Sequence, residues 1–290
     1  MEQMTNLMQK IAAKQSELGF EVMTAKDYEQ AKADAYNSSE GDLDKEDDYH
    51  CDICKNKGMI ASVVRNEQFG YFSEVYKPCK CHKARNAIRR LNKSGLKNVV
   101  KEYSFDKYQA EEPWQQTIKN SALQFCKDDD HNFFFIGGQS GAGKTHICTA
   151  IAVEYIRKGK EVRYMLWRDE ISKIKAVVNE GEEYGNLMNS LKQTDVLYID
   201  DLFKNGKGED GKPKPPTSAD INAAFEIINY RYNSKNLITI ISSERTLTEL
   251  LEIDEAVAGR IAERAKAGGY CFNLKKDKSR NWRMKGCGEI

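Results

Sequence analysis

A glycine-rich loop between an apolar run and a helical period carries the clearest chemistry in this sequence. Phe133–Ile136 are all apolar, and residues 137–145, GGQSGAGKT, contain the pattern GxxxxGK[ST]. Glycines let the backbone bend so that successive N–H groups point at phosphate oxygens, and the following helix directs its positive N-terminal end at the same anion. A buried strand before this pattern and a helix after it are the context that the motif requires, so we predict a phosphate-binding loop.

The pattern gives two residues of the loop specific roles with ATP and Mg²⁺. Lys144 is expected to reach the β- and γ-phosphates, and the hydroxyl of Thr145 is expected to ligate Mg²⁺. The alternative is a glycine-rich turn between a strand and a helix, without a ligand. The predicted nucleotide-binding residues of the loop are Gly138, Gln139, Ser140, Gly141, Ala142, Gly143, Lys144, Thr145 and His146.

Acidic and polar residues follow two further strand-like runs. Val196–Ile199 ends in Asp200 and Asp201. A carboxylate at the end of a buried strand is where a P-loop ATPase holds its Mg²⁺ through the water shell, so we assign Asp200 to the metal. Asp201 can act as a general base on the attacking water. Simple turn chemistry is the alternative for this pair. The run 237–243 ends in Ser242, Ser243 and Glu244, and its polar end should face the same crevice of a parallel sheet.

Four of the eight cysteines have the spacing of metal ligands. Cys51 and Cys54 form a CxxC pair, and Cys79 and Cys81 form a CxC pair. Each pair places two thiolates on one tight turn, and a predicted hairpin between them (62–65 and 70–76) would bring the pairs together. Four thiolates close a tetrahedral shell, which predicts structural Zn²⁺. The small core of this segment implies that the metal supplies most of its folding energy.

Other interpretations of the cysteines stay open. His50 or His82, which flank the pairs, could replace a thiolate, and an iron–sulfur cluster is a further alternative. Three of the remaining cysteines are expected to be small buried hydrophobic residues: Cys126, Cys148 and Cys271.

Predicted strands alternate with predicted helices after residue 101, and these elements must position the candidate site residues. Such alternation predicts a three-layer α/β domain with a mostly parallel sheet. The predicted strands are 132–136, 161–166, 195–199, 237–242 and 270–274, and the predicted helices are 145–157, 219–232 and 254–267.

Composition bounds the class of protein. The chain has 290 residues, of which 40% are hydrophobic and 31% charged, with 45 Lys and Arg against 44 Asp and Glu. This balance excludes a core-poor disordered protein and fits two domains. No run approaches about 18 apolar residues, and the N-terminus lacks the basic start and apolar run of a signal peptide. We therefore expect a cytoplasmic protein without a membrane partner.

The near-neutral total contains opposed charge blocks. The acidic stretch 27–48 is predicted to be a solvated linker after a short N-terminal helix over Met4–Ala12. The basic blocks 77–101 and 275–285 would attract polyanions, or they are solvated helix faces. The predicted domains are 1–48 (helix and linker), 49–100 (zinc-binding, with a basic helix) and 101–290 (ATPase).

The ordered motifs GGQSGAGKT, VLYIDDL, IISSE and AGRIAER resemble those of the AAA+ ATPases. The phrase IDDL, the phrase YSFDKY at residues 103–108 and the closing Asn281-Trp282-Arg283 look like the bacterial replicative-helicase loaders of the DnaC/DnaI type. The cysteine-rich segment resembles the zinc-binding N-terminal domain of DnaI-like and phage-type loaders. The resemblance covers about residues 50–290 and implies ATP hydrolysis coupled to helicase loading.

The resemblance also implies roles for residues outside the loop. Ser243 would lie near the sensor-1 position, and Arg283 matches the sensor-2-like arginine. Arg260 and Arg264 fall in the helix that in this family faces the ATP of a neighbouring subunit, where an arginine neutralises charge on the transferred phosphoryl group. We prefer Arg264, although the spacing does not choose between the two. The alternative is an exposed i,i+4 helix surface.

The implied partners are a DnaB-type replicative helicase, single-stranded DNA and further copies of this chain. The resemblance implies DNA contact over 167–192, where Trp167 and Tyr184 could stack on bases. Two other functions remain open: an IstB-like ATPase partner of a transposase, and a nucleotide-gated adaptor with little turnover.

Overall fold

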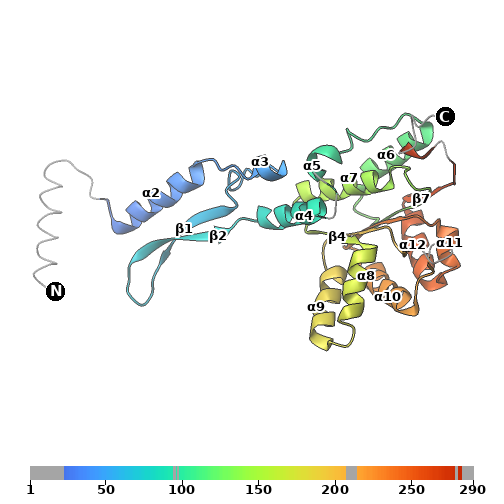
Figure 1. Cartoon of the computed structure of the whole chain (residues 1–290). Coiled ribbons are helices and arrows are strands. Elements are labelled where there is room, and N and C mark those ends of the chain that lie inside the picture. Colours follow the sequence, from blue (N-terminus) through green and yellow to red (C-terminus); the bar gives the residue numbers. More distant parts are fainter. Residues whose placement is uncertain (1–22, 94–95, 97, 207–213, 278–279, 283–290) are drawn as a thin grey trace, which may run out of the picture. The chain divides into compact units, whose positions relative to one another are not determined.

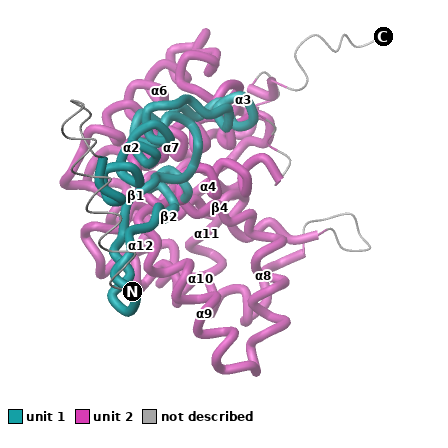
Figure 2. The backbone as a smooth tube through the Cα atoms, turned by 90° about the vertical axis from the view of Figure 1, so that its left-hand side faces the viewer, with its two compact units in different colours: residues 1–82 teal, residues 83–290 magenta. Residues whose placement is uncertain are grey.

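The computed structural model describes residues 23–93, 96, 98–206, 214–277 and 280–282. The chain divides into two compact units, residues 1–82 and 83–290 (Figures 1 and 2). The division lies before the boundary that was predicted at residue 100, because most of the basic helix groups with the second unit. The predicted helix over Met4–Ala12 and the predicted sensor residue Arg283 lie outside the described residues.

The first unit contains the predicted hairpin. The strands β1 (Met59–Arg65) and β2 (Phe72–Pro78) pair antiparallel, with Met59 opposite Pro78 and Arg65 opposite Phe72. The helices of this unit are α2 (Ala25–Ser38) and α3 (Asp44–Asp47), and α4 (Cys81–Lys93) begins at the last of the four clustered cysteines. The hairpin confirms the prediction and is longer than predicted.

The structure differs from the predicted solvated linker over 27–48. Most of that stretch is helix α2, which packs on both strands of the hairpin. Thr24 and Asp27 form a capping box that satisfies the first backbone N–H groups of the helix. Asn37 then donates to the carbonyl of Ala61 and accepts from its N–H, both at 2.9 Å. The prediction failed because the acidic residues lie on the exposed face of a helix that is attached to the hairpin by small and polar contacts.

A five-stranded parallel sheet forms the centre of the second unit. Its strands are β3 (Phe133–Gly138), β4 (Val162–Leu166), β5 (Val196–Asp200), β6 (Ile238–Ser243) and β7 (Cys271–Leu274). The order is β4-β5-β6-β3-β7, and every pairing is parallel. All five strands lie within one residue of a predicted boundary, except that β3 extends two residues further.

Helices cover both faces of this sheet, which confirms the predicted three-layer α/β architecture (Figure 1). Helix α7 packs on β4, β5 and β6, whereas α12 packs on β3 and β7 and contacts α10 and α11. The helices of this unit are α5 (Val99–Glu102), α6 (Pro113–Phe125), α7 (Lys144–Arg157), α8 (Trp167–Ala176), α9 (Gly181–Lys192), α10 (Ser218–Tyr232), α11 (Leu247–Leu251) and α12 (Glu255–Ala267).

The apolar run before the glycine loop is buried on both sides of the sheet. Phe133 and Phe135 belong to the core shared with α8, α10 and α12. Phe134 points to the opposite face, where it packs against Phe125 of α6 at 5.5 Å between ring centres. A continuous apolar strand is therefore required here, because alternate residues face two covered sides. In the part of the chain that the structure describes, no helix is both long and apolar enough to cross a membrane.

Candidate nucleotide site and cysteine cluster

The glycine loop joins β3 to α7 through residues whose backbone conformation excludes a side chain. Gly138, Gly141 and Gly143 have φ values of 108°, 76° and 80°, in the left-handed region. A Cβ atom on Gly138 would lie 2.1 Å from the carbonyl oxygen of Leu274, and one on Gly141 would lie 2.0 Å from Oδ1 of Asn281. The loop is therefore a tight cradle at the start of α7, as a phosphate site requires.

Lys144 is folded into this cradle. Its Nζ atom donates to the carbonyls of Gly138 and Gln139 at 2.9 and 2.8 Å. Burial lowers the pKa of Lys144, and the charge of Asp201 opposes that shift. The loop from Ser140 to His146 lines a cavity of about 430 Å³. The lysine is thus held beside a space that lies at the positive end of α7, where its ammonium can pair with phosphate oxygens.

The two residues predicted to hold Mg²⁺ lie next to each other. Asp200 ends β5 and is buried, and its carboxylate lies 3.4 Å from the hydroxyl of Thr145. Tyr164 on β4 donates to the same carboxylate at 2.9 Å, and Ser242 on β6 donates to it as well. Three neighbouring elements therefore orient Asp200 towards the first turn of α7.

Asp201 lies in the turn that follows β5 and lines the cavity. Its N–H donates to the hydroxyl of Ser242 at 3.0 Å, and its carboxylate accepts from Lys204 at 2.7 Å. Burial raises the pKa of Asp201 above its ordinary value, although the hydrogen bond from Lys204 opposes the shift. Asp201 is thus a carboxylate on the cavity wall with a raised pKa, which is compatible with the predicted general base.

Ser243 is not directed at this cavity. Its hydroxyl donates to the carbonyl of Leu202 at 2.9 Å and accepts from the N–H of Arg245 at 3.1 Å. The contacts that the sequence predicted for the end of β6 are made by its neighbours, because successive side chains of a strand point to opposite faces. Ser242 contacts both aspartates, and Glu244 lines the cavity.

An aromatic wall completes the cavity and was not predicted from the sequence. Tyr103 and Tyr108 pack against the ring of His146 at 5.3 and 5.4 Å between ring centres. The imidazole of His146 also lies 3.1 Å from the carbonyl of Ser104, and burial lowers its pKa. Both tyrosines belong to the phrase YSFDKY at residues 103–108, which indicated the family. The phrase did not indicate that these side chains would lie beside the glycine loop. Lys204, Arg280 and Trp282 also line the cavity.

The two candidate finger arginines of α12 do not line this cavity. Arg260 donates to Oδ1 of Asn229 at 2.8 Å and lies over the ring of Phe225 at 4.8 Å. Arg264 lies over the ring of Tyr232 at 4.9 Å and donates to the carbonyl of that residue. Both guanidinium groups are thus held on α10, partly exposed, on a surface apart from the nucleotide loop of the same chain.

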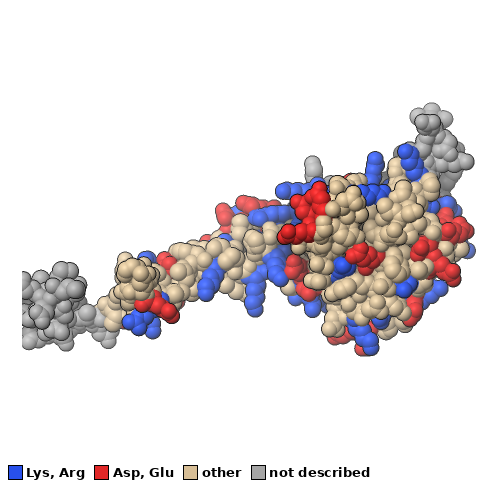
Figure 3. All heavy atoms as spheres, turned by 90° about the horizontal axis from the view of Figure 1, so that it is seen from below, with Lys and Arg blue, Asp and Glu red and all other residues tan. Residues whose placement is uncertain are grey.

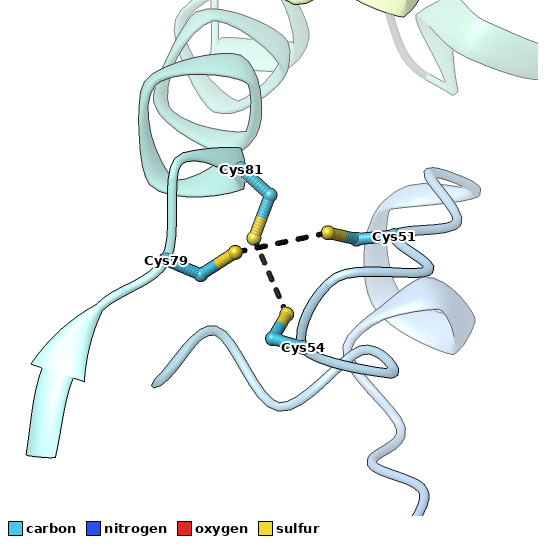
Figure 4. Close-up of side chains that lie close together, drawn as sticks. All are labelled: Cys51, Cys54, Cys79 and Cys81. Carbon is cyan, nitrogen blue, oxygen red and sulfur yellow. Dashed lines mark hydrogen bonds between the residues drawn. The ribbon is translucent and has the colours of Figure 1, made fainter. Parts of the chain in front are cut away.

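The four predicted metal ligands of the first unit come together (Figure 4). Their Sγ atoms all lie within 4.8 Å of one another, with Cys51 to Cys79 at 3.8 Å and Cys54 to Cys81 at 3.6 Å. A tetrahedron of thiolates at about 2.3 Å from Zn²⁺ has sulfur–sulfur edges of about 3.8 Å. The donors fit one tetrahedral ion, whereas a cluster of several irons would hold the sulfurs further apart.

The surroundings of the thiols support the same interpretation. Burial raises the pKa of Cys54, but the N–H of Gly58 and the neighbouring thiols outweigh that effect and bring the value to about 7, whereas burial keeps the pKa of Cys79 above its ordinary value. His50 does not join the four sulfurs, because its ring lies 3.0 Å from the side chains of both Asp52 and Asn56. His82 is exposed and is also absent from the group of ligands.

The predicted DNA-contact segment is only partly available. Trp167 is fully buried against Phe203, with 5.2 Å between ring centres, so it cannot stack on a base. Tyr184 and Lys192 both bind Glu226 of α10. Base stacking by Trp167 is therefore wrong, because the apolar side chains of α8 and α9 face the core, whereas DNA contact by the exposed residues of 167–192 stays a prediction. Figure 3 shows basic and acidic side chains interspersed over the second unit on the face in view.

Comparisons with known proteins agree with this site. A sequence profile described as IstB-like ATP binding protein matches residues 76–278. The phage-like element PBSX protein XkdC of Bacillus subtilis is 32% identical over 225 residues, which are 74% of this chain and 79% of that protein. The replicative helicase loader DnaC of Escherichia coli is 31% identical over 124 residues, 42% of this chain and 51% of DnaC, so the match spans about half of that protein.

A crystal structure of the DnaC helicase loader superposes with a TM-score of 0.45 and 23% identity, over 61% of this chain and 98% of that one. The profile match spans the glycine loop, the acidic pair and α12 in one stretch. The chain therefore belongs to the family of IstB-like ATP-binding proteins and is an AAA+ ATPase.

Proposed function

We propose that this protein is an ATP-dependent loader of a DnaB-type replicative helicase onto single-stranded DNA. The observation that carries the proposal is the match to the replicative helicase loader DnaC in a chain that also has a separate four-cysteine unit. An ATPase joined to a second compact unit can use one unit to bind a partner and the other to time its release.

In this proposal the nucleotide site hydrolyses ATP with residues that are already oriented. Lys144 neutralises the phosphates, and Asp201 accepts a proton from the attacking water. Thr145 and Asp200 would hold Mg²⁺, which supplies further neutralisation of phosphate charge when it is bound. Their separation of 3.4 Å and the hydrogen bond from Tyr164 to Asp200 support this assignment.

Hydrolysis would also depend on assembly. Arg260 and Arg264 lie away from the cavity of their own chain, so they are available to a neighbouring copy. Stacking on Phe225 and Tyr232 limits the freedom of both side chains before any partner arrives. An arginine supplied by a neighbour raises the rate by about 10³-fold or more in related phosphoryl-transfer enzymes.

The first unit, which contains the four cysteines, would bind the helicase, and Zn²⁺ would stabilise the fold of this unit. Its hairpin carries exposed aromatic side chains, with Phe69 at 69% and Tyr71 at 54% exposure. Large exposed apolar side chains on a small unit are typical of a protein-binding surface. Single-stranded DNA would contact the ATPase unit, where Lys or Arg side chains remain exposed on α4 and α8, including Arg89, Arg90 and Arg168.

A competitive pull-down tests the proposal against its main alternative. The full chain, loaded with Zn²⁺ and an ATP analogue, is presented with a DnaB-type helicase and with the transposase of an IS21-type element. The proposal predicts retention of the helicase, and loss of that retention in Cys54→Ser. The IstB-like profile supports a transposase partner instead, so retention of transposase alone would replace the loader function with that alternative.

A further inference from the structure

The turn after β5 has an unusual backbone. Asp201 and Phe203 have φ values of 58° and 59°, although neither is glycine. The left-handed conformation is unfavourable for such residues and persists only where the surroundings enforce it. Here the N–H of Leu202 donates to the carbonyl of Ser242 at 2.9 Å, and the side chains of Leu202 and Phe203 are fully buried. The turn is therefore rigid.

This turn brings Lys204 to the edge of the nucleotide cavity. Its Nζ atom lies 2.7 Å from Oδ2 of Asp201 and 2.9 Å from Oε1 of Glu244. All three residues line the cavity beside Lys144. Glu244 belongs to the segment after β6, so one lysine connects the ends of two neighbouring strands at the place where phosphate would bind.

The charges explain why such a lysine is needed. Asp201 and Glu244 face the same cavity as the glycine loop, and a nucleoside triphosphate would bring further negative charge to it. Like charges at these distances repel strongly in a partly buried site. Burial opposes ionisation of Glu244, but the hydrogen bond and charge of Lys204 hold the pKa of its carboxyl below the ordinary value. Lys204 is therefore the counter-ion of both carboxylates, and it favours the charged form of Glu244.

We propose that Lys204 is a positioning residue of the ATPase site, which holds Asp201 in place and neutralises Glu244 so that the cavity accepts a triphosphate. The proposal concerns ATP turnover by this chain and does not depend on the identity of the macromolecular partner. It predicts that loss of Lys204 weakens the binding of ATP more than the binding of ADP, because the terminal phosphate of ATP adds negative charge near the carboxylates.

Four variants of the full chain test this role: Lys204→Met, Lys204→Arg, Glu244→Gln and the double variant Lys204→Met/Glu244→Gln. Lys160→Met, at an exposed position after α7, is the matched control. Dissociation constants for ATP and ADP and the turnover number are measured for each. We expect Lys204→Met to lower the turnover number by about tenfold to a hundredfold. We also expect it to raise the dissociation constant of ATP more than that of ADP.

The pattern of rescue separates this role from a structural one. Lys204→Arg should restore most of the turnover because it keeps the charge. The double variant should bind ATP more tightly than Lys204→Met because the uncompensated carboxylate is gone, and Glu244→Gln alone should bind ATP at least as tightly as the wild type. Wild-type kinetics in Lys204→Met, or a double variant that binds ATP no better than the single one, would overturn the proposal.

Discussion

The nucleotide site and the cysteine cluster are both built from residues that are distant in the sequence, but they are held together differently. The nucleotide site takes its residues from β3, α7, β5 and β6, which pack around an extensive apolar core. In the first unit the buried cluster consists of the four cysteines themselves, with Tyr49 and Ile60 packed against them. We therefore expect the nucleotide site to be shaped before its ligand arrives, and the cysteine cluster to rely on its metal for its shape.

The largest expected effect comes from removing the metal. Chelation or Cys54→Ser should unfold residues 49–82 while the ATPase unit keeps its cooperative unfolding transition. Structural Zn²⁺ contributes about 10–16 kcal/mol to such small modules. Hydrogen exchange of the β1 and β2 amides, measured against those of β3, checks this expectation.

Cys271→Ala is the matched control for that experiment, because Cys271 lies in β7 and outside the cluster. The control should retain one zinc ion per chain and slow exchange in the hairpin. A hairpin that stays protected after complete zinc removal would break the contrast between the two units.

Removing the phosphate-binding lysine should impair the ATPase unit and leave the cysteine cluster unchanged. Lys144→Ala should reduce ATP turnover by at least about a hundredfold, because it deletes the cation at the phosphates. Zinc content and hairpin protection should be unchanged. Turnover and metal content are measured on the same preparation, with Lys160→Ala as the surface control. Loss of zinc in Lys144→Ala would show that the units are not independent.

A partly buried carboxylate in the second unit, that of Asp128, should make a smaller contribution to stability that depends on pH. Asp128 accepts hydrogen bonds from the Tyr270 hydroxyl at 2.7 Å and from the His131 ring at 2.8 Å. Although burial opposes it, these bonds lower the pKa of Asp128 to about 2. A folded-state pKa below the ordinary 3.8 means that the stabilisation is present above about pH 4 and is lost as the pH falls towards 2.

Asp128→Asn should therefore destabilise the ATPase unit by about 1–2 kcal/mol at pH 7 and have little effect near pH 2. Urea unfolding followed at both pH values measures this difference. Asp129→Asn, at the exposed neighbouring position, is the control. An equal loss at both pH values would assign the effect to packing instead of charge.

The smallest effect is expected at the junction of α2 with the hairpin. Asn37→Ala removes two hydrogen bonds to Ala61 and should cost about 1 kcal/mol. Because folding and metal binding are coupled in this unit, the apparent zinc affinity should fall by about fivefold. Competition with a chelator measures it, and Gln30→Ala on the exposed side of α2 is the control. An unchanged zinc affinity would mean that α2 contributes nothing to the metal-bound fold.

Much of the second unit is predictable because its signals are local. The strand Phe133–Gly138, the glycine loop and the start of α7 are consecutive in the chain, so the motif contains its own structural context. The hairpin and the four cysteines are likewise set by short patterns. Helix α2 escaped prediction because the surrounding stretch 27–48 is rich in acidic residues, while the burial of Ala33 and the pairing of Asn37 with β1 appear only in three dimensions.

The remaining differences concern residues whose role depends on non-local geometry. Ser242 and Ser243 are adjacent and chemically identical, and only the pleat of β6 decides which hydroxyl faces the aspartates. Trp167 has a side chain suited to base stacking, yet its side chain is buried against Phe203. Lys204 acquires its role by meeting Glu244 across two strand ends. No spacing in the sequence indicates these contacts.

Transfer of helicase onto circular single-stranded DNA tests the proposed function most directly. The full zinc-loaded chain, a DnaB-type helicase and ATP are incubated with the circle, and helicase retained on DNA is measured after a salt wash. A loader should increase retention strongly, and both Lys144→Ala and Cys54→Ser should abolish the increase. Retention that is the same with and without the protein, while the protein hydrolyses ATP normally, would contradict the proposal.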